Sequence, residues 1–367
     1  MPENTVLSFE EKVAMKLTKL FASFGYKKFK MSKFEEYDLY IENKSFLKSE
    51  NIIAFNDPTG KLLALKPDVT LSIAKNTADN ETEPRKLFYS ENVYRVSGNM
   101  HEFKEINQIG LELIGNIDNY SLCEVLNIAK LSLKEISDSY VLDISHMGLL
   151  IGLLESTGLP YDAREEISAY IGTKNSHEIR RVCSENGVDS SICEKLTTLA
   201  SLYGSIDKIL PEAEKLIVNE TTENAVKELK NVCSTLKASG NADNINIDFS
   251  VVSDISYYNG ITFRGFIENV PGSILSGGRY DNLLTKLGKS SGAVGFAVYM
   301  DLLSFLNKDS DRFDTDVLLV YGKDVSAQEV FAKVNELQSS GNRVFASCVE
   351  CKNIKYKTKV VLGEDMA

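Results

Sequence analysis

The stretch of sequence that decides the fold is residues 106–115, INQIGLELIG, in which apolar and polar side chains alternate. Alternation of this kind is typical of a β-strand, because successive side chains point to opposite faces of a sheet. It places Gln108, Gly110 and Glu112 on one face and Ile109, Leu111 and Leu113 on the other. A glycine between two polar groups is typical of a pocket floor, where a ligand can approach the backbone. The alternative interpretation is a solvated outer face with a chance glycine.

Polar clusters elsewhere in the chain favour the pocket over the solvated face. They are Lys66-Pro67-Asp68-Val69-Thr70, Arg95, Tyr257-Tyr258 and Gly277-Gly278-Arg279-Tyr280-Asp281. All of them fall at expected strands or turns. Adjacent residues of a strand point to opposite faces, so we expect only one of Tyr257 and Tyr258 to line the pocket. Gly277-Gly278-Arg279 could be a phosphate-binding turn, but it does not open a GxxxxGK[ST] loop.

The first part of the chain is predicted to form one helix followed by short strands. Ser8 and Glu11 have the spacing of a capping box, and the apolar periodicity after them predicts a helix that ends at Gly25. Short strands are expected from about residue 50. Residues 57–60, DPTG, have the composition of a hairpin turn between two of them.

The predicted secondary structure changes twice in the second part of the chain. Residues 120 to about 240 have mostly helical apolar spacing, and strands resume at residues 245–252. Asn259-Gly260 indicates a hairpin. After Lys308 an αβ pattern follows within about 55 residues. These features predict a mixed antiparallel αβ core, interrupted by a helical insertion and followed by a small αβ tail.

Composition restricts the class of protein. The chain has 367 residues, of which 43% are apolar, and this length suggests two or three domains. The 41 Lys and Arg against 52 Asp and Glu give a net charge of −11, which argues against one large phosphate-binding face but leaves room for a local patch. No apolar run approaches the roughly 20 residues of a membrane span, and the first residues lack the features of a signal peptide. Six scattered cysteines favour a reduced, cytosolic protein.

Five segments together resemble the histidyl-tRNA synthetase family. They are KFEEYDLY (33–40, the end of motif 1), LALKPDVTLSIAKN (63–76, the LRP-[DE]-x-T segment), VYRVSGNMHEFKEINQIGLELIG (93–115, motif 2), DFSVVSDISYYNGITFRGF (248–266, the histidine-pocket segment) and SGGRYDNLLTKLG with GAVGFAVYMDLL (276–303, the approach to motif 3). The match is colinear over about residues 8–308. It is therefore far more specific than any single motif.

The resemblance implies a fold and a domain arrangement. The fold is α+β, a class II aminoacyl-tRNA synthetase-like core in which helices flank an antiparallel sheet. We expect this core over residues 1–312, with the helical insertion at about 160–240. Residues 313–367 would form a small αβ C-terminal domain, shortened relative to an anticodon-binding domain. Motif 1 is the dimer-forming element, so we expect a homodimer that forms through residues 20–45.

Three positions depart from the synthetase pattern. The arginine of motif 2, which serves adenylate formation in histidyl-tRNA synthetases, is retained as Arg95. Two further arginines align with Ser253 and Leu302, and the second glycine of motif 3 aligns with Tyr299. Neither serine nor leucine supplies a charge or the planar fork that grips phosphate. Loss of both arginine contacts would cost the reaction roughly 3–6 kcal/mol of stabilisation, which slows it by a factor on the order of 10²–10⁴.

These losses fit a paralogous family, the regulatory subunits of ATP phosphoribosyltransferase. The resemblance implies a non-catalytic cytoplasmic subunit that works with a short catalytic subunit in the first step of L-histidine biosynthesis, in which ATP is joined to phosphoribosyl pyrophosphate. Histidine feedback is a further implied role. We expect no catalytic residues, metal or cofactor in this chain, and neither tRNA nor a membrane as a partner. The alternatives are a divergent histidyl-tRNA synthetase and a synthetase-like module that binds RNA or protein.

The resemblance also implies a pocket for free L-histidine. The residues expected to line it are Asp68, Thr70, Arg95, Gln108, Glu112, Tyr257 and Tyr258. Glu112 and the Tyr258 hydroxyl would hold the imidazole ring. Asp68, Thr70 and Gln108 would receive the α-ammonium group. The alternative is a pocket that is retained only for folding.

Cysteine and histidine spacings give no metal site. Cys348-Val349-Glu350-Cys351 is a single CxxC without a second pair of ligands, so we interpret it as a coincidence. His101, His146 and His177 lie far apart in the sequence. We interpret them as structural or surface residues.

Overall fold

The computed structural model describes residues 7–43, 52–79, 83–96, 102–252, 257–306 and 313–363. The chain divides into two compact units. The larger unit spans Val13–Ser304, and the smaller combines Met1–Lys12 with Phe305–Ala367. The expected boundary between residues 312 and 313 falls at the edge of the undescribed residues 307–312, and it stays a prediction.

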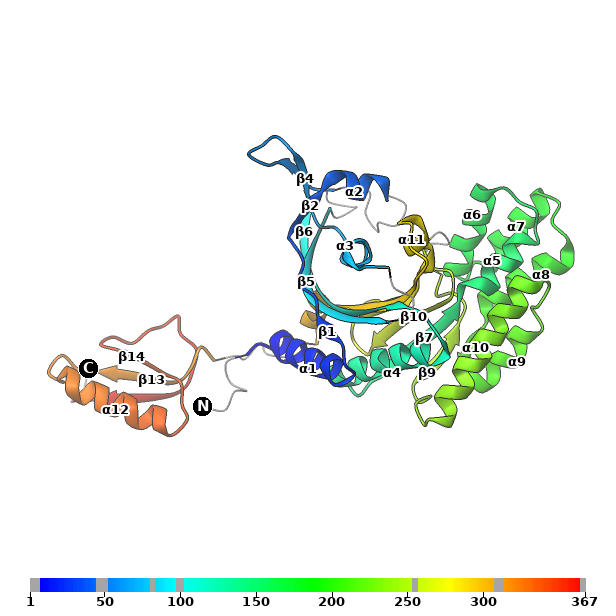
Figure 1. Ribbon diagram of the computed structural model, residues 1–367. Coiled ribbons are helices and arrows are strands. Elements are labelled where there is room, and N and C mark those ends of the chain that lie inside the picture. Colours follow the sequence, from blue (N-terminus) through cyan, green and yellow to red (C-terminus); the bar gives the residue numbers. More distant parts are fainter. Residues whose placement is uncertain are drawn as a thin grey trace. The chain divides into compact units, whose positions relative to one another are not determined.

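A nine-stranded sheet forms the centre of the larger unit (Figure 1). Its strand order is β1-β5-β6-β12-β11-β10-β7-β9-β8. Neighbouring strands are antiparallel except for the pairs β1–β5 and β7–β9. The strands are β1 (Lys27–Lys28), β5 (Arg85–Val96), β6 (Phe103–Gly115), β7 (Tyr140–His146), β8 (Tyr203–Ser205), β9 (Ile245–Asp248), β10 (Ile261–Ile267), β11 (Leu275–Arg279) and β12 (Gly292–Tyr299).

Helices cover both faces of this sheet. On one face lies α1 (Phe9–Ser23), whose Phe21 ring packs edge-on against Phe88 of β5 and Phe296 of β12. On the other face lie α3 (Thr70–Asn76) and α11 (Asp281–Lys286), whose apolar residues form one core cluster with Tyr89. Phe88 and Tyr89 are neighbours on one strand, so they point to opposite faces. Figure 1 shows the sheet curving around α3.

Two further helices complete the core. α4 (Asn119–Ile136) places Leu133 against Gly265 of β10, where a Cβ would lie 2.7 Å from the leucine methyl groups. The end of β12 leads into a short 3-10 helix, η3 (Met300–Phe305). α1 begins with the predicted capping box, in which Ser8 and Glu11 each accept the other's backbone N–H.

A helical insertion separates β7 from β9. Its helices are α5 (Met147–Glu155), α6 (Tyr161–Gly172), α7 (Ser176–Glu185), α8 (Ser190–Ser201), α9 (Ile206–Glu214) and α10 (Glu220–Ala238). The helical character predicted for this stretch is confirmed, with β8 as a short interruption that joins the edge of the large sheet. Within the described ranges, no helix combines the length and the apolar character that a membrane crossing requires.

A small antiparallel sheet contains the first predicted hairpin. It consists of β2 (Phe34–Glu36), β4 (Leu62–Leu65) and β3 (Ala54–Asn56), in the order β2-β4-β3, and α2 (Tyr37–Glu42) follows β2. Residues 57–60 form the turn between β3 and β4. The Asp57 carboxylate accepts the N–H groups of Thr59 and Lys61, which fixes the turn.

The smaller unit contains a parallel three-stranded sheet. The strands β13 (Thr315–Tyr321), β14 (Val344–Ser347) and β15 (Tyr356–Leu362) lie in the order β14-β13-β15. One helix, α12 (Ala327–Ser339), connects β13 to β14 and begins with a capping box formed by Ser326 and Glu329. The predicted αβ pattern of the tail is confirmed at the level of its elements.

The second predicted hairpin, at Asn259-Gly260, is wrong. β10 begins at Ile261 and pairs with β7 and β11, and Tyr257 and Tyr258 lie in a turn before it. Asn259 explains the difference, because its side chain binds the start of α11. Its carbonyl oxygen accepts the Asp281 N–H at 3.1 Å, and its amide nitrogen lies 3.3 Å from the Asp281 carboxylate. These bonds favour a docked turn over a strand.

Candidate functional site

Strand β6 supplies the floor of a cavity on the α3 side of the sheet. Glu112 and Gln108 point to the same face, as predicted, and are only 2% and 4% exposed. Glu112 lies between Leu87 of β5 and Gly295 of β12 in the strand register. A Cβ at position 295 would lie 1.8 Å from Glu112 Oε2. The buried carboxyl group therefore depends on a glycine in the neighbouring strand.

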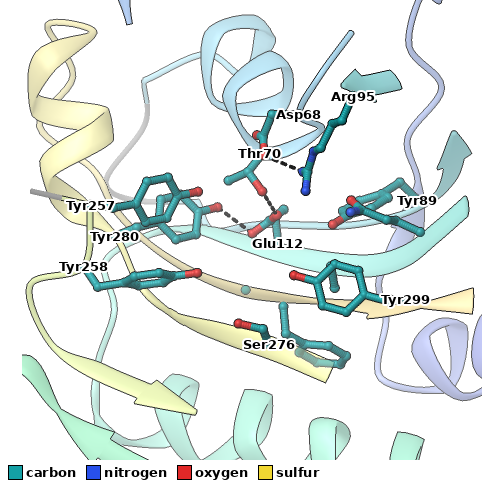
Figure 2. Close-up of a pocket in the computed structure, with 14 residues that line it drawn as sticks. Asp68, Thr70, Tyr89, Arg95, Glu112, Tyr257, Tyr258, Ser276, Tyr280 and Tyr299 are labelled. Carbon is teal, nitrogen blue, oxygen red and sulfur yellow. Dashed lines mark hydrogen bonds and ion pairs between the residues drawn. The ribbon is translucent and has the colours of Figure 1, made fainter. Parts of the chain in front are cut away.

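The Glu112 carboxyl group accepts two hydrogen bonds (Figure 2). Thr70 Oγ1 donates to Oε1 at 2.7 Å, and the Tyr280 hydroxyl donates to Oε2 at 2.5 Å. Burial raises the pKa of Glu112 to about 8; the two hydrogen bonds act against this rise, and the charge of Asp68 adds to it. Burial therefore favours the protonated form of Glu112 at neutral pH.

Tyrosines form the walls of the cavity. Those that line it are Tyr89, Tyr257, Tyr258, Tyr280 and Tyr299. The Tyr257 ring centroid lies 4.5 Å from that of Tyr258 and 5.8 Å from that of Tyr280. Burial raises the pKa of Tyr258 well above its usual value, so its hydroxyl stays uncharged and offers one proton donor and one acceptor.

Both Tyr257 and Tyr258 point into the cavity, as Figure 2 shows. The expectation that only one of them lines it is wrong. It assumed strand geometry, whereas the two residues lie in a turn, in which neighbouring side chains need not alternate.

Arg95 marks the other end of the cavity. Figure 2 shows it on the side of Tyr89 and Tyr299, away from Tyr257 and Tyr258. Its Nε donates to the Pro67 carbonyl at 2.9 Å, and its Nη2 lies 3.8 Å from Asp68 Oδ2. The guanidinium group is thus already engaged with the segment that precedes α3.

Asp68 connects this end of the cavity to α3. Its Oδ1 accepts the Leu71 N–H at 2.9 Å, which satisfies one of the free N–H groups at the start of that helix. The carboxylate therefore has a structural partner as well as an arginine beside it. It remains the ionisable oxygen group nearest to Arg95 in the cavity wall.

The structure brings all seven expected residues to the wall of this one cavity. Sequence reasoning did not assign seven further lining residues: Tyr89, Ser276, Tyr280, Gly295, Phe296, Ala297 and Tyr299. Tyr280 stood within a cluster that the sequence had marked, and Tyr299 at a position that departs from the synthetase motif. Tyr89 and Ser276 required the strand register, which the sequence does not reveal. The cavity is small, about 30 Å³, which is room for one or two water molecules.

Two glycine positions have other roles than the expected ones. At Gly110 a Cβ would lie 2.5 Å from the Tyr89 hydroxyl and 2.2 Å from the Phe296 carbonyl oxygen, so this glycine accommodates Tyr89 rather than an approaching ligand. Gly278 lies within β11, where a Cβ would lie 2.7 Å from the Tyr258 ring. It is a packing position and not part of a phosphate-binding loop.

The remaining marked residues lie elsewhere. Ser253 and His101 fall outside the described residues. Leu302 lies on η3. His146 caps α5, with its Nδ1 accepting the Gly148 N–H at 3.1 Å, as expected for a structural histidine. Where the structure describes the chain, no three His, Cys, Asp or Glu residues gather as metal ligands, and Cys351 Sγ lies 3.6 Å from Ser347 Oγ.

The chemistry of the cavity suits recognition of a small polar molecule. A buried, protonated carboxyl group and uncharged phenol hydroxyls can exchange hydrogen bonds with a neutral ring nitrogen, and aromatic faces favour flat or cationic groups. The arrangement offers much less for a triphosphate, because Arg95 is held by Pro67 and Asp68. Transfer of a nucleotidyl group requires several donors aimed at the developing charge.

Comparison of sequences identifies relatives over most of the chain. The sequence family described as Histidyl-tRNA synthetase matches residues 6–303. The ATP phosphoribosyltransferase regulatory subunit of Clostridium kluyveri is 31% identical over 336 residues, which cover 89% of this chain and 85% of that protein. The subunit of the same name from Caldanaerobacter subterraneus is 31% identical over 359 residues, covering 95% and 93%.

Solved structures share the fold. The crystal structure of an ATP phosphoribosyltransferase regulatory subunit/histidyl-tRNA synthetase from Bacillus halodurans superposes with a TM-score of 0.79 at 23% identity, covering 96% of this chain and 94% of that one. A chain of the ATP phosphoribosyl transferase (HisG:HisZ) complex from Thermotoga maritima gives a TM-score of 0.61 at 21% identity, with coverage of 80% and 97%. At these identities the likeness establishes the fold alone.

Proposed function

The chain belongs to the histidyl-tRNA synthetase family, within the branch of ATP phosphoribosyltransferase regulatory subunits, and we propose that it has no catalytic activity of its own. The observation that carries this proposal is the state of Arg95, which is held by the Pro67 carbonyl and Asp68. The two other arginines of the synthetase pattern are replaced by Ser253 and Leu302. Adenylate formation would therefore lack preorganised positive charge.

Histidine-dependent pyrophosphate–ATP exchange tests this proposal. We expect the purified chain to show no exchange above a reaction without protein. An authentic histidyl-tRNA synthetase assayed in parallel provides the positive control. Exchange at a rate typical of synthetases would favour the alternative, a divergent histidyl-tRNA synthetase.

The chain acts, in this proposal, by binding a short catalytic subunit of ATP phosphoribosyltransferase. The two subunits together would carry out the first step of L-histidine biosynthesis. Support comes from two relatives that are named ATP phosphoribosyltransferase regulatory subunit. Each is 31% identical to this chain over most of its length. The HisG:HisZ complex of Thermotoga maritima also contains a chain with this fold. Size-exclusion chromatography of the mixed subunits tests the association, and separate elution of the two proteins would contradict it.

The cavity, in the same proposal, binds free L-histidine and could serve feedback. Glu112 and the Tyr258 hydroxyl would hold the imidazole ring, while Asp68, Thr70 and Gln108 would receive the α-ammonium group. All five groups line the cavity, which is the geometric support for this assignment; because the cavity is only about 30 Å³, binding of an amino acid would require its walls to move apart. Calorimetric titration with histidine tests it. If the Glu112→Gln variant binds histidine as the wild-type chain does, the histidine site lies elsewhere.

A homodimer through residues 20–45 completes the proposal. Within this stretch Phe34 is 46% exposed, and its ring packs edge-on against Phe55 of β3 at 5.3 Å. Ile41 of α2 is 43% exposed. Exposed apolar side chains on adjacent elements fit a surface that another chain covers. Light scattering of the isolated chain should give the mass of two copies; the mass of one copy for the wild-type chain would contradict the proposal.

A further inference from the structure

Arg264 of β10 lies on the same face of the sheet as the proposed histidine pocket. In the strand register it stands opposite Ser276 of β11, and Ser276 lines the cavity. Residues that face each other across neighbouring strands project from the same side of a sheet. Arg264 therefore follows Ser276 directly in one row of side chains, one strand beyond the cavity wall.

The guanidinium group of Arg264 reaches the chain beside a position at which the family pattern has a cation. Its Nη2 donates to the Val252 carbonyl at 2.8 Å. Val252 directly precedes Ser253, the residue that aligns with an arginine in the histidyl-tRNA synthetase pattern. The charge of Arg264 thus lies against the backbone of Val252, the residue that precedes position 253 in the sequence, and it is supplied by a different strand.

The charge of Arg264 is not neutralised by an acidic partner within the described part of the chain. Among those residues, no carboxylate lies within ion-pair distance of it, although Asp143 of β7 stands opposite in the register. Asp143 Oδ1 is buried and accepts no hydrogen bond within the described residues, so it does not receive the guanidinium group. In contrast, Arg279 pairs with Asp281 at 2.8 Å.

Arg264 also acts electrostatically on a residue of the pocket. Burial dominates the pKa of Tyr258 and raises it, and the positive charge of Arg264 acts against this rise. Tyr258 is a wall residue of the cavity. The positive charge of Arg264 therefore acts on a residue of the pocket wall, Tyr258, at the end opposite to Arg95.

We propose that Arg264 supplies the cation that receives the carboxylate of the amino acid bound in the pocket. This assignment rests on the proposed histidine pocket and adds the group that recognises the ligand's carboxylate. The guanidinium fork can offer a carboxylate two parallel hydrogen bonds, which a serine hydroxyl at position 253 cannot. A charged hydrogen bond of this kind corresponds to about ten- to hundredfold in affinity.

Histamine provides the discriminating ligand, because it carries the imidazole ring and the ammonium group of histidine but no carboxylate. We would titrate the full chain with histidine and with histamine by calorimetry, as wild type and as Arg264→Gln. Arg181→Gln is the matched control, since it removes the same charge from the distant helix α7. The expected result is a ten- to hundredfold loss of histidine affinity in Arg264→Gln, with histamine affinity unchanged, and no effect in the control.

Arg264→Lys is a second variant, which keeps the proposal testable if the glutamine variant does not fold. It keeps the charge but not the fork, so its histidine affinity should fall less than that of Arg264→Gln. Equal losses for histidine and histamine, or an unchanged histidine affinity, would overturn the role of Arg264 while the Glu112-dependent pocket stands. Absence of histidine binding in the wild-type chain would overturn the pocket and this assignment together.

Discussion

The two ends of the pocket differ in the group that each presents and in the contacts that this group makes with the protein. At the Glu112 end, a buried carboxyl accepts hydrogen bonds from Thr70 and Tyr280 and is enclosed by aromatic rings. At the Arg95 end, the guanidinium group is turned to the Pro67 carbonyl and Asp68. The first end presents a buried, hydrogen-bonded carboxyl group to the cavity, whereas at the second end the cation is already engaged by the protein itself.

Under the proposed function, this difference means that recognition and chemistry can be lost independently on one fold. Groups that distinguish one amino acid from another form part of the packed core, where Glu112 is 2% exposed. In the proposed function, the leucine at position 302 removes a cation that the chemistry requires, while the hydrogen bonds around Glu112 are kept.

The largest effect is expected for Glu112→Gln. An amide keeps the donor and acceptor of a protonated carboxyl group, but it cannot release its proton and form an ionic pair with the imidazole ring, so histidine binding should fall by about ten- to hundredfold. Glu105→Gln on the same strand is the matched control, since Glu105 is exposed and its carboxylate accepts hydrogen bonds from Asn92 and Tyr94 outside the cavity wall. Calorimetry would show equal affinities for the two variants if the Glu112 end does not recognise the ligand.

The raised pKa of Glu112 predicts a dependence of stability on pH. An unfolded glutamate titrates near 4.5 and the folded one near 8, so between these values the folded state holds an additional proton. The free energy of unfolding should therefore fall as pH rises through this window, by at most about 1.4 kcal/mol per pH unit, and this contribution should level off outside it. Urea unfolding of wild type and Glu112→Gln at several pH values isolates this term. Parallel profiles for the two proteins would contradict the buried, protonated carboxyl.

Gly295→Ala tests whether the pocket floor tolerates one additional carbon. The new Cβ would overlap Glu112 Oε2, so the carboxyl must move, and the variant should lose about 1–3 kcal/mol of stability. Gly172→Ala is the control, because a Cβ there would have its nearest neighbour at 3.8 Å. Thermal unfolding of both variants measures the difference. An unaltered melting temperature for Gly295→Ala would mean that Glu112 is less tightly enclosed than described.

Tyr280→Phe removes one hydrogen bond from the Glu112 end and should have the smallest effect. The loss is expected to be about 1 kcal/mol in the free energy of unfolding. Because that hydrogen bond lowers the pKa of Glu112, its removal should extend the pH-dependent window to higher pH. Denaturant titration across pH 7 to about 9 checks both points. A window that moves to lower pH would contradict the hydrogen bond.

The sequence predicted the Glu112 end well because the relevant pattern is local. Period-two alternation put Gln108 and Glu112 on one face, and the fold class and the family resemblance are confirmed by the structural and sequence relatives. Tyr257 and Tyr258 were misplaced because their geometry depends on a turn held by Asn259.

The parts that the sequence could not predict depend on strand pairing. Tyr299 lies beside Gln108, and Arg264 beside Ser276, only because β12 pairs with β6 and β10 pairs with β11. Pairing of this kind joins residues that are far apart in the chain, and no local periodicity encodes it. The position of Arg264 beside Ser276 is therefore visible only in three dimensions.

Reconstitution of the proposed complex tests the central claim most directly. The purified chain would be mixed with a short-form ATP phosphoribosyltransferase catalytic subunit from the same genome, and the condensation of ATP with phosphoribosyl pyrophosphate would be measured with and without it. We expect the chain alone to show no condensation and the mixture to turn over faster than the catalytic subunit alone. An unchanged rate, together with histidine-dependent pyrophosphate–ATP exchange by the chain itself, would contradict a regulatory subunit and identify a synthetase instead.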